Sequence, residues 1–185
     1  FHYSELETLT GLLTRDAFID RAATMVAARD RSDDRFVTVI VISMDSFSLL
    51  TAMTAPAGAD EAPVAIGHRI TETLRRDAVL AHVGESEYLI ADTFTTADAS
   101  VLTDRLQQVV ITAPFRLSAS IGVVTTPIGS IVGLPPHDIV EELIAIATTN
   151  MYTARRAGGK RTEATACPPL TSTDNVDDLD LDDAP

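Results

Sequence analysis

One run of nine residues constrains the fold of this chain more than any other feature. The segment 36–44, FVTVIVISM, is almost continuously apolar and rich in β-branched residues. Such a run is typical of a strand covered on both faces, because a half-exposed strand would alternate apolar and polar residues. It is also far shorter than the ~18–20 apolar residues that a membrane-spanning helix needs. The sequence therefore predicts a buried central strand with helices packed on the sheet around it.

Helical and strand-like patterns alternate along the rest of the chain. Apolar residues at helical spacing predict helices over 18–26, 64–74, 97–110 and 138–157, and short apolar runs predict strands over 79–83, 87–91 and 115–125. The polar stretch 84–86 between two strands predicts a hairpin turn. Pro56 and Pro63 indicate a break before the second helix. Asp138 is placed to cap the last helix, in which Tyr152 is expected to point inward and which Gly158 should end.

The length and charge indicate one globular domain followed by a tail. The chain has 185 residues, 45% of them hydrophobic, and a net charge of −13. We expect the domain to cover 1–163 and the polar, acidic segment 164–185 to be a disordered tail without a binding role. An acidic body argues against nucleic-acid binding and against contact with an anionic membrane. The single cysteine, Cys167, excludes an internal disulfide and fits a cytoplasmic domain.

The chain begins at Phe1, without an initiator methionine. We therefore expect it to be part of a longer protein. Whether that protein has a membrane anchor stays open.

Five short motifs follow one another in the order and at the spacing of the GGDEF family of bacterial diguanylate cyclases. They are LTGL at 9–12 followed by Arg15 and Phe18, SMDSF at 43–47, GESEY at 84–88, SASIGV at 118–123, and MYTAR at 151–155 followed by Ala157 and Gly158. The resemblance covers about 5–161. It implies an α/β (α+β) fold: a ferredoxin-like, nucleotide-cyclase-like sandwich with a mostly antiparallel five-stranded central sheet flanked by helices.

The family's activity depends on metal ligands that this sequence lacks. The resemblance implies condensation of two GTP molecules into cyclic di-GMP between two facing domains, with Mg²⁺ or Mn²⁺ neutralising the triphosphates. Ser43 stands where the family has a metal-binding aspartate, and Ser86 stands where the family has an acid needed for metal binding and catalysis. Hard cations prefer anionic oxygen ligands, which a serine hydroxyl does not provide. Asp45 and Glu87 are the remaining candidates for a metal site, although acids at strand ends are more often solvated or paired.

The hairpin motif and the nucleotide contacts also depart from the family pattern. The hairpin motif here is GESEY, which comprises Gly84, Glu85, Ser86, Glu87 and Tyr88. Glu85 replaces the glycine against which GTP lies, Ser48 replaces a lysine and Gly159 an arginine. The nucleotide-binding remnants are Thr51 in place of a guanine-reading asparagine, Asp60 at the guanine-reading aspartate, and Arg155 in place of a phosphate-binding lysine. Asp60 is equally suited to cap a helix, and Arg155 is expected at a helix C-terminus from the helix dipole alone.

The family's product-inhibition motif, RxxD, is incomplete. Arg75 is present, but Ala78 occupies the aspartate position and Asp77 lies one residue too early. We therefore expect no inhibitory site. His82 replaces an arginine that commonly precedes the hairpin, and a structural role for it is favoured over catalysis.

Three functions are compatible with these residues. The first is a catalytically inactive GGDEF domain that acts as a signalling or interaction module, through a protein partner or self-association, with weak or absent GTP binding and no cofactor. The second is an active diguanylate cyclase that uses Mg²⁺ or Mn²⁺ with Asp45 and Glu87 as ligands. The third is a sensor that binds GTP through Asp60 and Arg155 without turnover. Ser43, Ser86 and Glu85 favour the first over the second.

Overall fold

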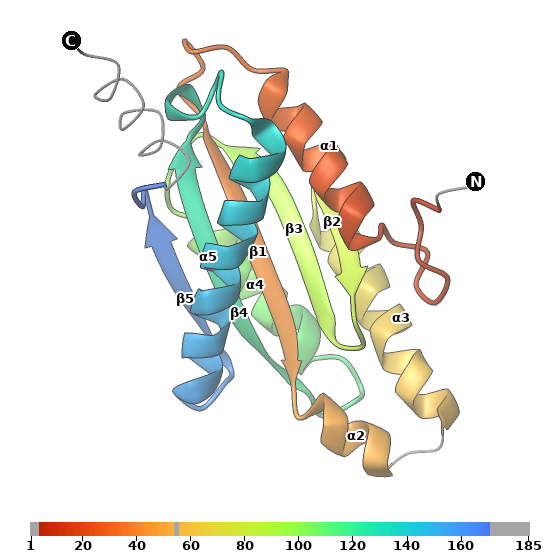
Figure 1. Ribbon diagram of the computed structural model, residues 1–185. Helices are drawn as coiled ribbons and strands as arrows, with labels where there is room; N and C mark the ends of the chain where they lie inside the picture. The colour runs from red at the N-terminus through yellow and green to blue at the C-terminus, as the bar shows by residue number, and fades with distance from the viewer. Residues whose placement is uncertain (1–3, 54–55, 171–185) are drawn as a thin grey trace, which may run out of the picture.

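The computed structural model describes residues 4–53 and 56–170, and its central element is a five-stranded sheet (Figure 1). The strands are β1 (Phe36–Asp45), β2 (Val79–Val83), β3 (Glu87–Phe94), β4 (Ser118–Pro127) and β5 (Arg161–Ala166), in the spatial order β2-β3-β1-β4-β5. All neighbouring pairs are antiparallel except β4 and β5, which are parallel. The predicted mostly antiparallel five-stranded sheet is confirmed.

Helices cover both faces of this sheet. They are α1 (Arg15–Ala27), α2 (Phe47–Met53), α3 (Pro56–Thr73), α4 (Ser100–Ile111) and α5 (Pro136–Arg156), with a 3₁₀ turn at Ile128–Ser130. Helices α1 and α5 lie on one face, and α3 and α4 lie on the other (Figure 1). Successive side chains of β1 alternate between the two cores, with Val39 and Val41 in the first and Ile40 and Ile42 in the second. The prediction of a central strand buried on both faces is confirmed.

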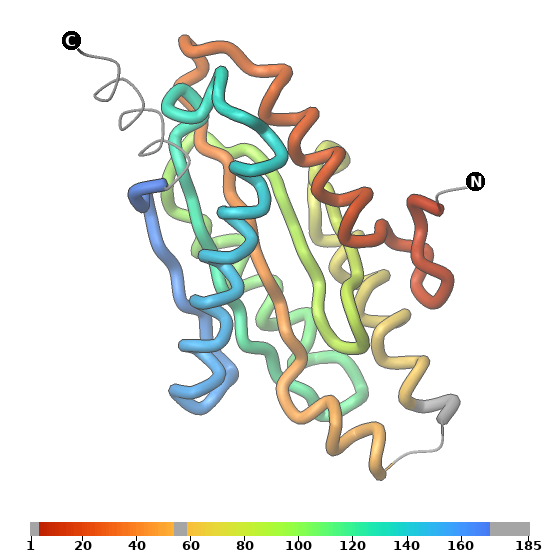
Figure 2. Tube along the Cα trace, in the orientation of Figure 1, coloured from red at the N-terminus to blue at the C-terminus, as the bar shows by residue number. Residues whose placement is uncertain are grey.

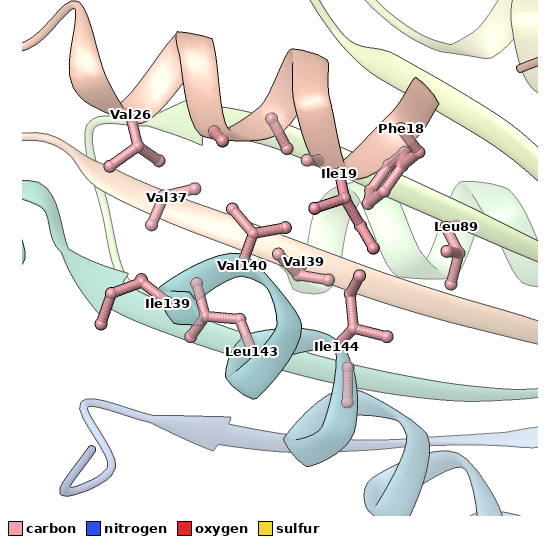
Figure 3. Close-up of a cluster of buried hydrophobic side chains, with 14 of the residues drawn as sticks. Phe18, Ile19, Val26, Val37, Val39, Leu89, Ile139, Val140, Leu143 and Ile144 are labelled. Atoms are coloured by element: carbon pink, nitrogen blue, oxygen red, sulfur yellow. The ribbon is translucent and has the colours of Figure 1, made fainter. Parts of the chain in front are cut away.

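The core between α1, α5 and the sheet is closely packed. Phe18 and Ile19 of α1 and Val140 and Ile144 of α5 lie around Val39 of β1 (Figure 3). Helix α5 lies directly against β4 at Gly122, where a Cβ atom would lie 1.8 Å from the carbonyl oxygen of Ala147. Tyr152, predicted to point inward, is instead 46% exposed on the outer side of α5.

Three details of the helices differ from the sequence predictions. Helix α3 begins at Pro56 and continues through Pro63, so the predicted break is wrong. Proline is tolerated in a first turn, and at Pro63 burial of the neighbouring residues Ala62 and Ile66 outweighs the lost backbone hydrogen bond. Asp138 lies inside the first turn of α5 rather than at its N-cap. Helix α2 was not predicted, since only its Phe47 is buried.

The C-terminal end of the fold extends past the predicted boundary at 163. Strand β5 crosses it and ends at Ala166, and Leu170 is buried in the core to which α1 and α5 also contribute. The segment RTEATA gave no strand signal because β5 is an edge strand with mostly exposed, polar side chains. Residues 171–185, which carry the acidic part of the predicted tail, lie outside the described residues. Within 4–53 and 56–170 no helix is long and apolar enough to cross a membrane.

Candidate functional site

The GESEY segment forms a tight turn between two antiparallel strands. Gly84 adopts the left-handed backbone conformation with φ of 60°, which favours glycine. Glu85 is exposed, and the carbonyl oxygen of Ser86 accepts a hydrogen bond of 2.9 Å from the backbone nitrogen of Met44. Glu87 then opens β3 directly opposite Ser43 on β1. The predicted hairpin is confirmed, and it brings Ser86 and Glu87 beside Ser43.

Arg155 reaches into this end of the sheet from the last turn of α5. Its guanidinium donates a hydrogen bond to Oγ of Ser43, which is buried. Its Nε lies 3.9 Å from Oδ1 of Asp45. Arg155 aligns with a phosphate-binding position of the family, but its guanidinium here contacts Ser43 and Asp45 of the sheet.

Asp45 is held by three hydrogen bonds besides its ion pair with Arg155. Its carboxylate accepts from the hydroxyls of Ser118 at 2.8 Å and Ser120 at 2.6 Å, both on β4. It also accepts from the backbone nitrogen of Lys160 at 2.9 Å, just after the turn that follows α5. A Cβ at Gly159 would lie 2.7 Å from this carboxylate, so glycine is required for the turn to approach it. Asp45 thus fastens the end of α5 to the centre of the sheet.

We call Arg155 and the five residues around it the sheet-end cluster, which comprises Ser43, Asp45, Glu87, Ser118, Ser120 and Arg155. In this cluster Glu87 is half-buried, and burial raises the pKa of its carboxyl while the positive charge of Arg155 opposes that rise.

We tested whether this cluster fits a divalent metal ion. Within the described part of the chain, no three His, Cys, Asp or Glu side chains gather as a possible metal site. Asp45 already accepts three hydrogen bonds, and a guanidinium lies beside it. A cation in that position repels a second cation. The residues present do not fit a divalent metal ion.

The other nucleotide-binding remnants lie on neighbouring helices. Thr51 is on α2, where its hydroxyl donates to the carbonyl oxygen of Ser48 at 2.8 Å. Asp60 is exposed on α3, and it is not the N-cap because the helix already begins at Pro56. The structure therefore leaves the carboxylate of Asp60 facing solvent.

Arg75, the remnant of the inhibitory motif, is engaged within the domain. Its guanidinium donates to both carboxylate oxygens of Asp92, at 3.0 and 2.8 Å, and to the carbonyl oxygen of Thr93. It also lies over the ring of Phe94, 5.4 Å from the centroid. The side chain of Asp92 is only 3% exposed, so Arg75 neutralises a buried charge. Sequence reasoning missed this pair, because nothing near Asp92 in the sequence indicates its partner.

The comparisons with known proteins agree with this architecture. A family model described as "Diguanylate cyclase, GGDEF domain" matches residues 4–161. The chain belongs to the GGDEF family. It is 32% identical over 165 residues to the diguanylate cyclase TpbB of Pseudomonas aeruginosa, and the match covers 86% of this chain but only 37% of that protein.

Solved GGDEF domains share the fold. The FimX GGDEF domain from P. aeruginosa superimposes with a TM-score of 0.73 at 20% identity, covering 88% of this chain and 100% of that one. Diguanylate cyclase SiaD, in a complex with its activator SiaC from the same organism, gives a TM-score of 0.72 at 20% identity, covering 88% of this chain and 62% of that one.

Proposed function

We propose that this GGDEF domain is non-catalytic and serves as a signalling or interaction module of a larger protein. The observation that carries the proposal is the place of Arg155, whose guanidinium lies against Ser43 and Asp45 at the end of the sheet. By the alignment with the family, this is where diguanylate cyclases hold their metal ions.

The chemistry of the cluster supports this proposal. A divalent ion stabilises the charge of a triphosphate through open coordination positions. A guanidinium offers only N–H donors, and those of Arg155 are directed at Ser43 and toward Asp45. The exposed carboxylate of Glu85 adds negative charge at the turn, where the family places the polyanionic substrate. Both features oppose the binding of a metal–nucleotide complex.

We propose that the domain acts through a protein partner or through self-association. The curated relative TpbB is much longer than this chain, and SiaD was solved with a separate activator protein bound. These relatives support a domain that works together with other protein segments. The exposed free thiol of Cys167 supports a cytoplasmic location, where thiols stay reduced.

Calorimetric titration with GTP tests the proposal against the two alternatives. The parent protein should give no heat beyond dilution, with or without Mg²⁺, because the sheet-end cluster offers no metal site. Binding that needs no metal and disappears in Asp60→Ala would establish the GTP sensor instead. Metal-dependent binding that disappears in Glu87→Ala would contradict the proposal. The GGDEF domain of TpbB, titrated under the same conditions, is the control for an intact site.

A further inference from the structure

The N-terminal segment 5–14 is hydrogen-bonded to β2, the strand that leads into the hairpin turn. The backbone nitrogen of Leu13 donates to Leu80, and that of His82 donates to Leu13 at 3.2 Å, so the segment extends the sheet beside β2. Figure 2 shows this segment in red at the β2 side of the sheet, opposite to β5. A displacement of this segment would therefore shift β2 and the GESEY turn that follows β2.

The imidazole of His82 lies between this segment and the turn. Its side chain is only 1% exposed. Nδ1 lies 3.1 Å from Oε1 of Glu7, and Nε2 lies 3.2 Å from the backbone carbonyl oxygen of Glu85. A carbonyl and an ionised carboxylate only accept hydrogen bonds. Both contacts form together only when both ring nitrogens carry a proton, and the ring is then an imidazolium.

The surroundings of Glu7 favour its ionised form. Burial alone raises the pKa of this carboxyl, but hydrogen bonds from the hydroxyl and backbone of Thr10 and the charge of His82 outweigh burial. The resulting pKa is below the ordinary value of 4.5. Glu7 is therefore a hydrogen-bond acceptor at neutral pH.

The other groups against the ring do not compensate its charge. Tyr88 of β3 lies with its ring centroid 5.1 Å away, and burial raises the pKa of its hydroxyl, which donates to the carbonyl oxygen of Pro63 on α3. Glu85 contributes its backbone carbonyl and keeps its side chain exposed. The charge that pairs with the imidazolium is that of Glu7.

We propose that protonated His82 is a latch that joins the N-terminal segment to the GESEY turn, and that loss of one ring proton releases one of the two. A neutral imidazole donates a single hydrogen bond, so either Glu7 or the carbonyl of Glu85 loses its donor. The latch lies at the opposite end of the GESEY turn from the sheet-end cluster and is independent of whether the domain binds GTP.

The pH window of the latch follows from its two groups. Because the pKa of Glu7 is lowered in the fold, its contribution is present above about 4.5 and is lost as the pH falls through the lower value. At the other limit, the ion pair is lost when the imidazolium gives up one of its two ring protons. The latch is therefore closed while Glu7 is ionised and both ring nitrogens of His82 are protonated, and it opens when either condition fails.

Nuclear magnetic resonance of the full chain tests the latch. Long-range ¹⁵N correlation spectra should show both ring nitrogens of His82 protonated at pH 5.5. Amide resonances of 7–12, of 84–86, or of both should then shift with the same midpoint as the ring titrates. His82→Gln identifies the ring signals and should abolish those shifts. His68, which is exposed on α3 beside Glu72, is the matched control, and His68→Gln should leave the shifts of both segments unchanged. A ring that stays neutral at pH 5.5, or one that titrates while neither segment responds, overturns the proposal.

Discussion

Replacing Gly122 with alanine is expected to prevent the domain from folding stably. The added Cβ would lie 1.8 Å from the carbonyl oxygen of Ala147 and 2.4 Å from the backbone nitrogen of Met151. Both atoms belong to the backbone of α5, so no side-chain rotation relieves the overlap. The helix would have to move off β4, and α5 carries much of the core on its face of the sheet. Overpacking ordinarily lowers the free energy of unfolding by about 1–3 kcal/mol. Because the contact here is with rigid backbone, we expect Gly122→Ala to lower it by the upper end of that range or more.

The same substitution at Gly67 provides the control. There a Cβ would meet the flexible end of Leu12 at 3.1 Å and the ring of Tyr88 at 3.4 Å. Gly67 lies inside α3, where alanine is favoured over glycine by about 0.8–1.0 kcal/mol, so Gly67→Ala should be close to neutral. Urea unfolding followed by circular dichroism measures both variants. Equal stability losses in the two would show that α5 is not seated on β4 as described.

A divalent metal site should appear when the family's acidic residues are restored and Arg155 is replaced. In the variant Ser43→Asp, Ser86→Asp, Arg155→Ala, two new carboxylates would join Glu87, because Ser43 pairs with Glu87 and the carbonyl oxygen of Ser86 accepts a hydrogen bond from the adjacent Met44. Without metal the carboxylates repel one another and lower the melting temperature. A ligand at about 100 times its Kd stabilises by ~2.7 kcal/mol. For a domain of this size that is about 5–10 °C in Tm.

The matched control keeps the arginine. In Ser43→Asp, Ser86→Asp alone, the guanidinium of Arg155 remains beside the new carboxylates and competes with the metal, so the rise in Tm with Mn²⁺ should be smaller. The parent protein should show no rise. If the triple variant folds and its Tm is unchanged by Mn²⁺, the three positions do not converge on one site.

The elements with the strongest local patterns were predictable. The segment 36–44 predicts β1 because its side chains are apolar on both faces, and the stretch 84–86 predicts the turn because two apolar runs flank it. Helix α2 and strand β5 were not predictable by the same reasoning. Neither buries a periodic apolar face: α2 buries only Phe47, and β5 lies at the edge of the sheet.

The candidate site was predictable as a set of positions but not as a set of contacts. The motif spacing aligns Ser43, Ser86 and Arg155 with family positions. It does not reveal that the guanidinium bonds to Ser43, because the two residues are 112 positions apart and meet only through the packing of α5 on the sheet. The same holds for His82 and Glu7, which are 75 positions apart. Long-range contacts between polar side chains leave no periodic signal in the sequence.

The proposal that the domain is non-catalytic is tested most directly by incubating the domain with GTP and Mn²⁺ and separating the nucleotides by chromatography. Because the reaction needs two facing domains, this chain and the GGDEF domain of TpbB should each be fused to the same parallel coiled coil, so that enforced pairing is equal in both. A non-catalytic domain yields no cyclic di-GMP under conditions in which the TpbB fusion does. Cyclic di-GMP formed by this chain, at a rate that is lost in Glu87→Ala, would contradict the non-catalytic function and the role assigned to Arg155.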